Sequence, residues 1–230
     1  MQAVKPDGPP PDILVASWFP GTVMTSTAIR ILVVDDHPLF RAGVVAMLAG
    51  EPGILIVGQA GTAAEGIELF RAMRPDVAVV DLKLPDMDGD EVVGAMRRIE
   101  PLARVIVLTT YGGDAAARRT LAAGAQAYLL KTALANDLIG VVRDVHAGQH
   151  RVSAEVARRL SEYRGDEDLT ERELSVLRGV AAGMENKQIA RHLGIAADTV
   201  KEHLSHAMAK LRATNRAHAL SIALERGYLA

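Results

Sequence analysis

Short apolar runs alternate with amphipathic helical patterns through the first two thirds of the chain. The runs, rich in Val, Ile and Leu, are Ile31–Val34, Ile54–Val57, Val77–Val80, Val105–Leu108 and Ala127–Leu130. Pro38 suits the first turn of a helix after the first run, and further helical patterns lie at about 62–73, 89–99, 114–124 and 134–147. Because strands buried on both faces read as uninterrupted apolar runs, this alternation predicts a five-stranded parallel sheet with helices on both sides, a doubly wound α/β domain.

The pattern in residues 167–230 is helical throughout. Thr170 and Glu173 form a capping box that opens a first helix, and Asn215 can cap a fourth. Apolar residues recur on one face of the third helix, at Val200, Leu204, Met208 and Leu211. Two helices joined by a tight glycine turn, the second long and basic, predict a helix-turn-helix in which 197–210 is the recognition helix.

Two segments lie outside these patterns. Residues 1–28 contain five prolines, which interrupt regular structure, and we expect either a disordered N-terminal extension or sequence upstream of a start at Met24. Residues 148–166 contain a short amphipathic helix beginning at Ser153 and a polar, acidic stretch, so we expect a flexible or semi-helical tether. The expected organisation is an extension (1–28), an α/β domain (29–147), a linker (148–166) and a helical domain (167–230).

Composition narrows the function classes. The 230 residues include no cysteine, which excludes disulfides, thiolate metal sites and cysteine nucleophiles. No apolar run approaches the roughly 18 residues of a membrane span. Net charge is −2 overall, but residues 29–147 carry 12 Lys/Arg and 15 Asp/Glu, whereas residues 169–230 carry 9 and 6. The resulting charges of −3 and +3 suggest two domains with different partners.

Polar residues stand where the predicted strands end. Because the carboxyl ends of parallel strands converge on one edge of a sheet, we expect five of them to meet: Asp35, Asp36, Asp81, Thr109 and Lys131. Taken singly, each has an ordinary explanation, such as a helix cap, a strand end or a solvated lysine. Taken together, adjacent carboxylates would repel one another unless a divalent cation neutralised them, and oxygen ligands suit Mg²⁺. The set therefore predicts a Mg²⁺ site with a carboxylate nucleophile and a phosphate clamp, which is the chemistry of an aspartyl-phosphate switch.

Residues 29–147 resemble the receiver domain of two-component response regulators. The motifs that carry the resemblance are, in order, LVVDDHPLFRAG, VVDLKLPDMDG, VIVLTTY and AGAQAYLLK. The resemblance implies that Asp81 is the phosphoacceptor, which takes the phosphoryl group from the phosphohistidine of a sensor kinase. It also implies direct Mg²⁺ ligation by Asp36, Asp81 and the Lys83 backbone carbonyl, with Asp35 acting mainly through water.

The same resemblance gives roles to the other residues of the site. Lys131 would neutralise charge on the phosphoryl oxygens, Thr109 would donate its hydroxyl to one of them, and Tyr128 would rotate inward as part of the switch. A strand tyrosine half-packed at the surface is the alternative explanation for Tyr128. From its position two residues after Asp81, and not from the resemblance, we also expect the Lys83 side chain to lie close enough to the phosphoryl group to tune its lifetime.

The segment LTERELSVLRGVAAGMENKQIARHLGIAADTVKEHLSHAMAKL resembles the LuxR-type DNA-binding domain, and this order of domains is that of NarL/FixJ-type response regulators. The resemblance implies that Thr199, Lys201 and Ser205 face DNA, with Lys201 and Glu202 nearest the base edges. Candidate phosphate contacts, chosen mainly by charge, are Lys187, Arg191, His203 and Lys210. A solvated basic helix face is the alternative explanation for Lys201 and Lys210.

Two positions depart from the LuxR-type pattern. The family often has Ser or Thr just before the Asn-Lys pair and just after the Gly-Ile pair, where this chain has Glu185 and Ala196. A missing N-cap costs about 1 kcal/mol, so both helix starts are expected to be weaker unless Asn186 or Asp198 compensates. Glu202 would repel phosphate, but its carboxylate could accept a hydrogen bond from cytosine N4.

These features together predict a cytoplasmic, DNA-binding response regulator that a sensor histidine kinase phosphorylates on Asp81. Phosphorylation would release the DNA-binding domain, promote homodimer formation, or both, and the enzymatic chemistry would be limited to self-catalysed phosphoryl transfer and autodephosphorylation. One alternative is a Mg²⁺-dependent phosphatase with an aspartyl intermediate, but such enzymes typically have a general acid where this chain has Lys83. Another alternative is a phosphorylation-independent transcription factor with a relic receiver.

Overall fold

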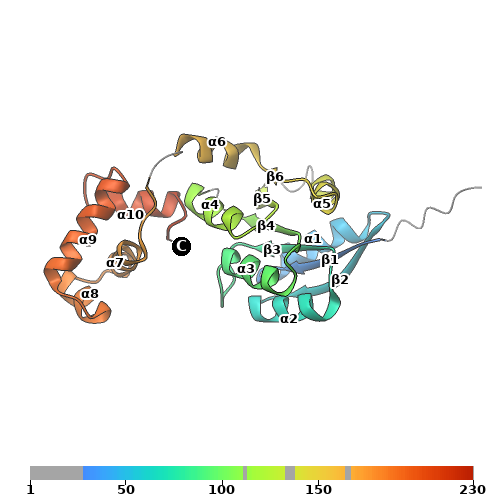
Figure 1. The fold of residues 1–230 in the computed structure, drawn as a ribbon, viewed down its shortest axis with the longest axis horizontal. Helices are drawn as coiled ribbons and strands as arrows, with labels where there is room; N and C mark the ends of the chain where they lie inside the picture. Colours follow the sequence, from blue (N-terminus) through green and yellow to red (C-terminus); the bar gives the residue numbers. More distant parts are fainter. Residues whose placement is uncertain (1–27, 111–112, 133–137, 164–166, 230) are drawn as a thin grey trace, which may run out of the picture.

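The computed structural model describes residues 28–110, 113–132, 138–163 and 167–229. The expected N-terminal extension, apart from Ala28, and the start of the helix expected at 134–147 lie outside the described residues. A parallel sheet with flanking helices forms one part of the molecule, and a bundle of short helices forms the other (Figure 1). Among the described helices, none is both long and apolar enough to cross a membrane.

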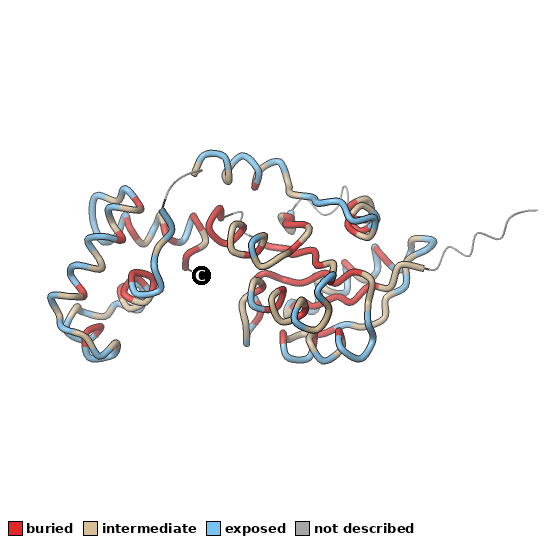
Figure 2. Tube along the Cα trace, in the orientation of Figure 1, coloured by how far each residue is buried: buried red, intermediate tan, exposed pale blue. Residues whose placement is uncertain are grey.

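The sheet confirms the doubly wound architecture. Its strands are β1 (Ile29–Val34), β2 (Ile54–Ala60), β3 (Val77–Asp81), β4 (Val105–Thr109), β5 (Ala127–Leu130) and β6 (Arg151–Val152). They lie in the order β2-β1-β3-β4-β5-β6, and every neighbouring pair is parallel. The central strands β3 and β4 are buried along their whole length (Figure 2), as their continuous apolar sequences require.

We predicted five strands, but the sheet has six in the part of the chain that the structure describes. The sixth strand lies in the segment expected to be a tether, where the Arg151 N–H donates to Gln126 O at 2.8 Å and the Ser153 N–H donates to Tyr128 O at 3.2 Å. These bonds satisfy backbone groups that the edge of β5 would otherwise leave unpaired. The amphipathic helix expected from Ser153 is α6 (Ala154–Glu162), and its Val156 is fully buried in the core of the α/β domain. Part of the expected tether therefore belongs to that domain.

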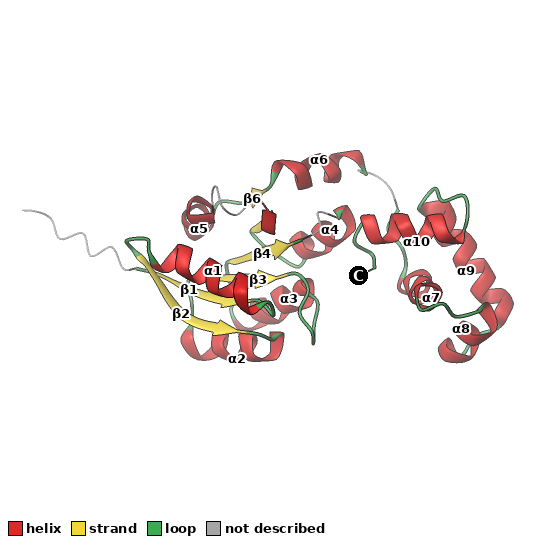
Figure 3. Cartoon of the chain, turned by 180° about the vertical axis from the view of Figure 1, so that it is seen from behind, coloured by secondary structure: helices red, strands yellow, loops and turns green. Residues whose placement is uncertain are grey.

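Helices cover both faces of the sheet (Figure 3). One core lies against α1 (Pro38–Ala49) and α5 (Leu138–His146). The core on the other face lies against α2 (Ala63–Met73), α3 (Gly89–Ile99), α4 (Asp114–Ala122) and α6. Alternate residues of β1 enter opposite cores, because side chains alternate across a strand.

The helical domain follows the predicted pattern. It consists of α7 (Glu171–Ala181), α8 (Asn186–Leu193), α9 (Ala197–Lys210) and α10 (Arg216–Glu225). The predicted capping box is present, since the Glu173 N–H donates to Thr170 Oγ1 at 3.2 Å and the Thr170 N–H donates to Glu173 Oε2 at 2.8 Å. Asn215 caps α10 as predicted, with its Oδ1 accepting from the His218 N–H at 2.9 Å.

The two departures from the LuxR-type pattern have different outcomes. At the start of α8, the Glu185 N–H donates to Gln188 Oε1 at 2.7 Å, so a glutamine three residues on supplies the compensating bond. At the start of α9, Ala196 offers no side-chain cap, and Asp198 pairs with Lys201 at 2.9 Å. The start of the expected recognition helix therefore lacks the side-chain cap that the Ser or Thr of the family would provide.

Gly89 generates a testable prediction for the loop that follows β3. A Cβ at this position would lie 2.9 Å from Leu82 Cα and 3.2 Å from the backbone oxygens of Asp81 and Leu82. Since backbone atoms cannot rotate away, we expect Gly89→Ala to lower the free energy of unfolding by about 1–3 kcal/mol, the usual cost of overpacking. Urea unfolding of the α/β domain measures this change.

Gly89 is the first residue of α3, and Gly94 lies in the same helix. The substitution Gly94→Ala is therefore the matched control. Its added Cβ would meet only Arg98 Nη1, at 3.7 Å. We expect Gly94→Ala to be neutral or to stabilise the protein by about 0.5–1 kcal/mol, because alanine is the better helix former. Equal unfolding free energies for the two variants would contradict the assignment of the close contact at Gly89.

Candidate functional site

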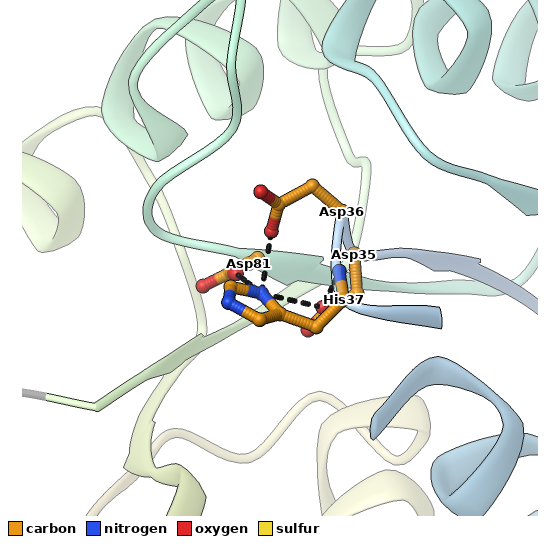
Figure 4. Close-up of side chains that lie close together, drawn as sticks. All are labelled: Asp35, Asp36, His37 and Asp81. Atoms are coloured by element: carbon orange, nitrogen blue, oxygen red, sulfur yellow. Dashed lines mark hydrogen bonds and ion pairs between the residues drawn. The ribbon is translucent and has the colours of Figure 1, made fainter. Parts of the chain in front are cut away.

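Four side chains meet at the carboxyl edge of the sheet (Figure 4). Asp35 and Asp36 follow β1, Asp81 ends the neighbouring strand β3, and His37 is the N-cap residue of α1. Each side chain offers one nitrogen or oxygen atom, and these atoms all lie within 4.8 Å of one another. Pairing of the two strands brings the acids together although the sequence separates them widely.

An ammonium group holds two of these acids. Lys131, directly after β5, places its Nζ 2.7 Å from Asp81 Oδ2 and 2.7 Å from Asp35 Oδ2. The three side chains are 3–7% exposed, so the contacts are shielded from solvent. The ammonium also lies 4.4 Å from the centroid of the Phe40 ring, which adds a cation–π contact. The expected meeting of Asp35, Asp81 and Lys131 thus occurs in the structure.

Burial controls the electrostatics of the central carboxylate. Desolvation raises the pKa of Asp81 above its usual value, and the hydrogen bond and charge of Lys131 act against that rise. The nearby Asp35 charge raises the pKa further. A partly desolvated carboxylate beside a fixed cation is well placed for nucleophilic attack on an anionic group, because the cation can stabilise charge on the reagent.

The chemistry of the donor set fits a divalent cation. Asp35 Oδ2 and Asp36 Oδ1 are buried and accept no hydrogen bond, although ion-pair contacts reach both. Three carboxylates face one ammonium here, which leaves an excess of negative charge. Carboxylate oxygens with this charge are the ligands that hard divalent cations prefer. The acidic cluster is therefore compatible with a divalent metal site.

His37 was not singled out by sequence reasoning. Its Nδ1 lies 2.6 Å from Asp36 Oδ1 and 3.5 Å from Asp35 Oδ1, while 65% of its side chain remains exposed. In the sequence, its position directly after Asp35 and Asp36 is the feature that could have pointed to it. An imidazole there can contact any group that approaches the carboxylates from solvent.

The loop after β3 is held by its own contacts. The Lys83 N–H donates to Asp81 Oδ1 at 3.4 Å, but the Lys83 ammonium binds Asp88 Oδ1 at 2.9 Å. Asp86, also missed in the sequence, accepts from the N–H groups of Ala63 and Ala64 at 2.8 and 2.9 Å, and these bonds lower its pKa. The loop is therefore tied to the start of α2, and in the structure the Lys83 side chain pairs with Asp88.

The remaining receiver residues lie on the next two strands. Thr109 ends β4 and is 2% exposed, and Tyr128 in β5 is fully buried. Burial raises the pKa of Tyr128 to about 12, while the neighbouring Thr109 side chain acts in the opposite direction. The alternative of a half-exposed surface tyrosine is therefore wrong.

The expected DNA-reading residues lie on α9. Lys201, Glu202 and Ser205 are exposed, while Thr199 and His203 are half-buried. On α8, the expected phosphate contacts Lys187 and Arg191 are also exposed.

Lys210, the fourth expected phosphate contact, is engaged within the protein. Its Nζ binds Glu173 Oε2 at 3.0 Å and the Asp168 backbone oxygen at 3.2 Å, and only 20% of its side chain is exposed. The solvated-surface alternative therefore does not describe Lys210.

Comparisons with known proteins identify two families in the chain. The family "Response regulator receiver domain" matches residues 31–143, and the family "Bacterial regulatory proteins, luxR family" matches residues 167–223. The transcriptional regulatory protein LiaR of Bacillus subtilis (strain 168) is 35% identical over 199 residues, which cover 83% of this chain and 94% of LiaR.

Solved structures of response regulators match the chain over most of its length. The response regulator ChrA of a heme-sensing two-component system is 31% identical, covers 88% of this chain and 100% of its own, and gives a TM-score of 0.53. RcsB from Salmonella enterica serovar Typhimurium, bound to promoter P1flhDC in the presence of phosphomimetic BeF3-, is 25% identical, covers 86% of this chain and 98% of its own, and gives a TM-score of 0.65. The chain belongs to the NarL/FixJ-type response regulators of two-component systems, in which a receiver domain precedes a LuxR-type DNA-binding domain.

Proposed function

We propose that Asp81 accepts a phosphoryl group from a sensor histidine kinase and that this event controls promoter binding by a homodimer. The observation that carries the proposal is the burial of Asp81 between the Lys131 ammonium, at 2.7 Å, and the adjacent acids. A carboxylate oxygen of Asp81 attacks phosphorus, the phosphorus–nitrogen bond breaks, and the electron pair returns to the histidine nitrogen of the kinase. Phosphoryl transfer needs mainly positioning and charge neutralisation, so the receiver can supply the catalysis itself.

Each receiver residue has a role in this proposal. Asp36, Asp81 and the Lys83 backbone carbonyl would hold Mg²⁺, with Asp35 acting through water. When bound, the ion neutralises negative charge on the transferring phosphoryl oxygens. Lys131 binds one of those oxygens, and Thr109 donates its hydroxyl to another.

Phosphorylation changes the charge of the site. The new group adds roughly −1.5 to −2 charge and three acceptor oxygens. Movement of Thr109 towards one of these oxygens would vacate space near Tyr128. Because the Tyr128 ring is already buried, its rotation into that space within the core would complete the switch.

The two alternatives from the sequence have less support. A phosphatase would need a general acid near Asp81, and the Lys83 ammonium instead pairs with Asp88. A relic receiver would have no need to keep Asp35, Asp81 and Lys131 in contact, at a considerable cost in desolvation. Both alternatives predict that phosphorylation of Asp81 has no effect on DNA binding.

The DNA-binding proposal concerns the exposed side of α9. Thr199, Lys201, Glu202 and Ser205 would face the major groove, and phosphates would be contacted by Lys187, Arg191, His203 and Lys210. Lys210 would have to leave its ion pair with Glu173 to do so. With a net charge of only +3 in residues 169–230, one domain neutralises few phosphates, so two domains on two half-sites are the economical solution.

Two further parts of the proposal follow from the domain order. We place the receiver at 29–147, the linker at 148–166 and the DNA-binding domain at 167–230, after an N-terminal extension at 1–28. The first part of the linker, β6 and α6, packs onto the receiver. A cytoplasmic location agrees with the proposed partners, because the target DNA and the phosphorylated histidine of the kinase would both be met there.

Replacement of the phosphoacceptor tests the central claim. We expect Asp81→Asn to abolish phosphorylation by a small-molecule phosphodonor in the presence of Mg²⁺, because the amide has almost the same shape but is not a nucleophile. Phosphate-affinity electrophoresis measures the product. Asp88→Asn is the control in the same loop, since asparagine also caps helices well, and it should be phosphorylated normally. Undiminished phosphorylation of Asp81→Asn would show that another residue is the acceptor.

Removal of divalent cations tests the metal site. We expect chelation by EDTA to slow phosphorylation by about 100-fold or more, because metal neutralisation of phosphoryl charge is worth several kcal/mol. Isothermal titration should also show weaker Mg²⁺ binding by Asp36→Asn than by the wild-type protein. Equal Mg²⁺ affinities would remove Asp36 from the proposed ligand set.

Two neighbouring residues of α9 test the proposed DNA contacts. We expect Lys201→Ala to weaken binding to all duplexes and to reduce its salt dependence, because a cation is lost. We expect Glu202→Ala to change sequence preference, because a carboxylate that could accept from cytosine N4 is lost. Selection from a random duplex library, repeated at several salt concentrations, separates the two effects. Identical changes on every sequence from both variants would refute this division of roles.

A further inference from the structure

His37 directs a ring nitrogen into the acid cluster at the edge of the sheet (Figure 4). Its Nδ1 lies 2.6 Å from Asp36 Oδ1, 3.5 Å from Asp35 Oδ1 and 3.8 Å from Asp81 Oδ2. Asp35 and Asp81 are buried, whereas 65% of the His37 side chain is exposed. The imidazole therefore lies at the border between the buried acids and solvent, with one nitrogen turned towards the acids.

The backbone of His37 is held in place from both sides. Its N–H donates to Asp35 Oδ1 at 2.8 Å, and its carbonyl oxygen accepts from the Arg41 N–H at 2.9 Å. Pro38, the first residue of α1, further restricts the backbone of the residue before it. His37 is the N-cap residue of α1, but its side chain makes no capping hydrogen bond. Helix capping therefore does not explain why the imidazole points towards the acids.

The contact between His37 and Asp36 is close but is not a hydrogen bond. Within the part of the chain that the structure describes, the buried Asp36 Oδ1 accepts no hydrogen bond, although His37 Nδ1 lies only 2.6 Å away. A neutral imidazole nitrogen and a carboxylate oxygen both carry lone pairs that a cation can accept. One explanation of the contact is an ion pair between a protonated imidazole and Asp36, and the other is a pair of ligands for one cation. The two explanations predict different metal binding.

Lys131 and His37 approach Asp35 through different oxygens. The Lys131 ammonium lies 2.7 Å from Asp35 Oδ2, whereas His37 faces Asp35 Oδ1 through both its backbone N–H and its ring. A cation between His37 and Asp36 would therefore not have to break the ion pair between Lys131 and Asp35. Negative charge also remains to attract it, because three carboxylates face one ammonium.

The four donor atoms can reach one ion after small movements. They all lie within 4.8 Å of one another. Metal bonds to histidine nitrogen and carboxylate oxygen are about 2.0–2.2 Å long, so two ligands of one ion lie at most about 4.2–4.4 Å apart. The side chains of His37 and Asp36, 65% and 34% exposed, have room to make up the difference.

An imidazole changes which metal ions such a site prefers. Mg²⁺ takes oxygen ligands and keeps several waters, so a nitrogen ligand contributes little to its binding. Imidazole suits Fe²⁺, Ni²⁺, Cu²⁺ and Zn²⁺, and the affinity of mixed nitrogen and oxygen sites rises from Mn²⁺ to Cu²⁺. The three acids alone favour hard cations, whereas the three acids with His37 form a mixed donor set.

We propose that His37 Nδ1 is a ligand of the divalent cation at this site and that it makes the site prefer first-row transition-metal ions to Mg²⁺. This inference rests on the proposed function, because the acids involved are those that would hold Mg²⁺. The buried acids decide whether a cation binds at all, and the exposed imidazole decides which kind of cation binds best.

Spectroscopy of bound Mn²⁺ tests the ligand directly. Electron spin-echo envelope modulation detects a nitrogen nucleus bonded to this paramagnetic ion. We expect nitrogen coupling in the full-length wild-type protein and in His150→Ala, and loss of the coupling in His37→Ala. His150, an exposed histidine between α5 and β6, is the matched control. Bound Mn²⁺ without nitrogen coupling in the wild-type protein would overturn the inference, and this result needs no variant.

Calorimetry tests the preference between ions. The affinity for Ni²⁺ is measured by competition with bound Mg²⁺, because Ni²⁺ can also bind histidines elsewhere on the surface. We expect His37→Ala to lower the ratio of Ni²⁺ affinity to Mg²⁺ affinity at least about tenfold, since even the loss of a group that only supports a metal ligand typically costs 10–100-fold. His150→Ala should leave the ratio unchanged. An unchanged ratio in His37→Ala would show that the imidazole only forms an ion pair with Asp36, and the inference would be wrong.

Failure of the proposed function gives a different result. If the wild-type protein bound neither Mg²⁺ nor Mn²⁺, the proposed metal site and the role of His37 would both be refuted. If it bound Mg²⁺ and became phosphorylated, but showed no nitrogen coupling with Mn²⁺, only the role of His37 would be refuted.

Discussion

The contact between the Lys131 ammonium and the carboxylates of Asp35 and Asp81 is the constraint on which the receiver depends. Both distances are 2.7 Å in a nearly solvent-free position, so the strands that carry these groups must keep their register for the charges to remain paired. The neighbouring Asp36 leaves the cluster with more negative than positive charge. A further cation stabilises a site of this kind because it offsets the excess negative charge. An added anion increases that excess and so changes the forces between the charged groups.

Helix α4 belongs to the hydrophobic cores of both domains. Three consecutive alanines, Ala115, Ala116 and Ala117, are buried on different sides of this helix. Small side chains allow close approach from both domains, and tightly packed interfaces tend to exchange between discrete arrangements instead of deforming gradually. One short helix therefore packs against both the sheet of the receiver and the helical domain.

The sequence predicted the elements that show a periodic pattern of apolar residues. It missed the features that form only through contacts between distant parts of the chain. Five strands and the meeting of Asp81 with Lys131 followed from apolar runs and the parallel order of strands. Strand β6 was missed because the pair Arg151–Val152 is too short to show a pattern, and pairing with β5 alone makes it a strand. Asp114 and Arg226 were also missed, because their separation in the sequence gives no sign that they meet. Only the fold shows that they are buried together as an ion pair.

Because α6 packs against α4 and the sheet, fewer linker residues separate the two domains. Because Val156 is anchored in the receiver core and α7 begins at Glu171, an undocked DNA-binding domain can move only a short distance away. Short tethers keep linked partners at effective concentrations of about millimolar. A weak contact between the two domains is therefore enough to keep them associated. Under the proposed function, a domain released by phosphorylation would therefore be captured again quickly once the phosphoryl group is lost, without any need for a tight interface.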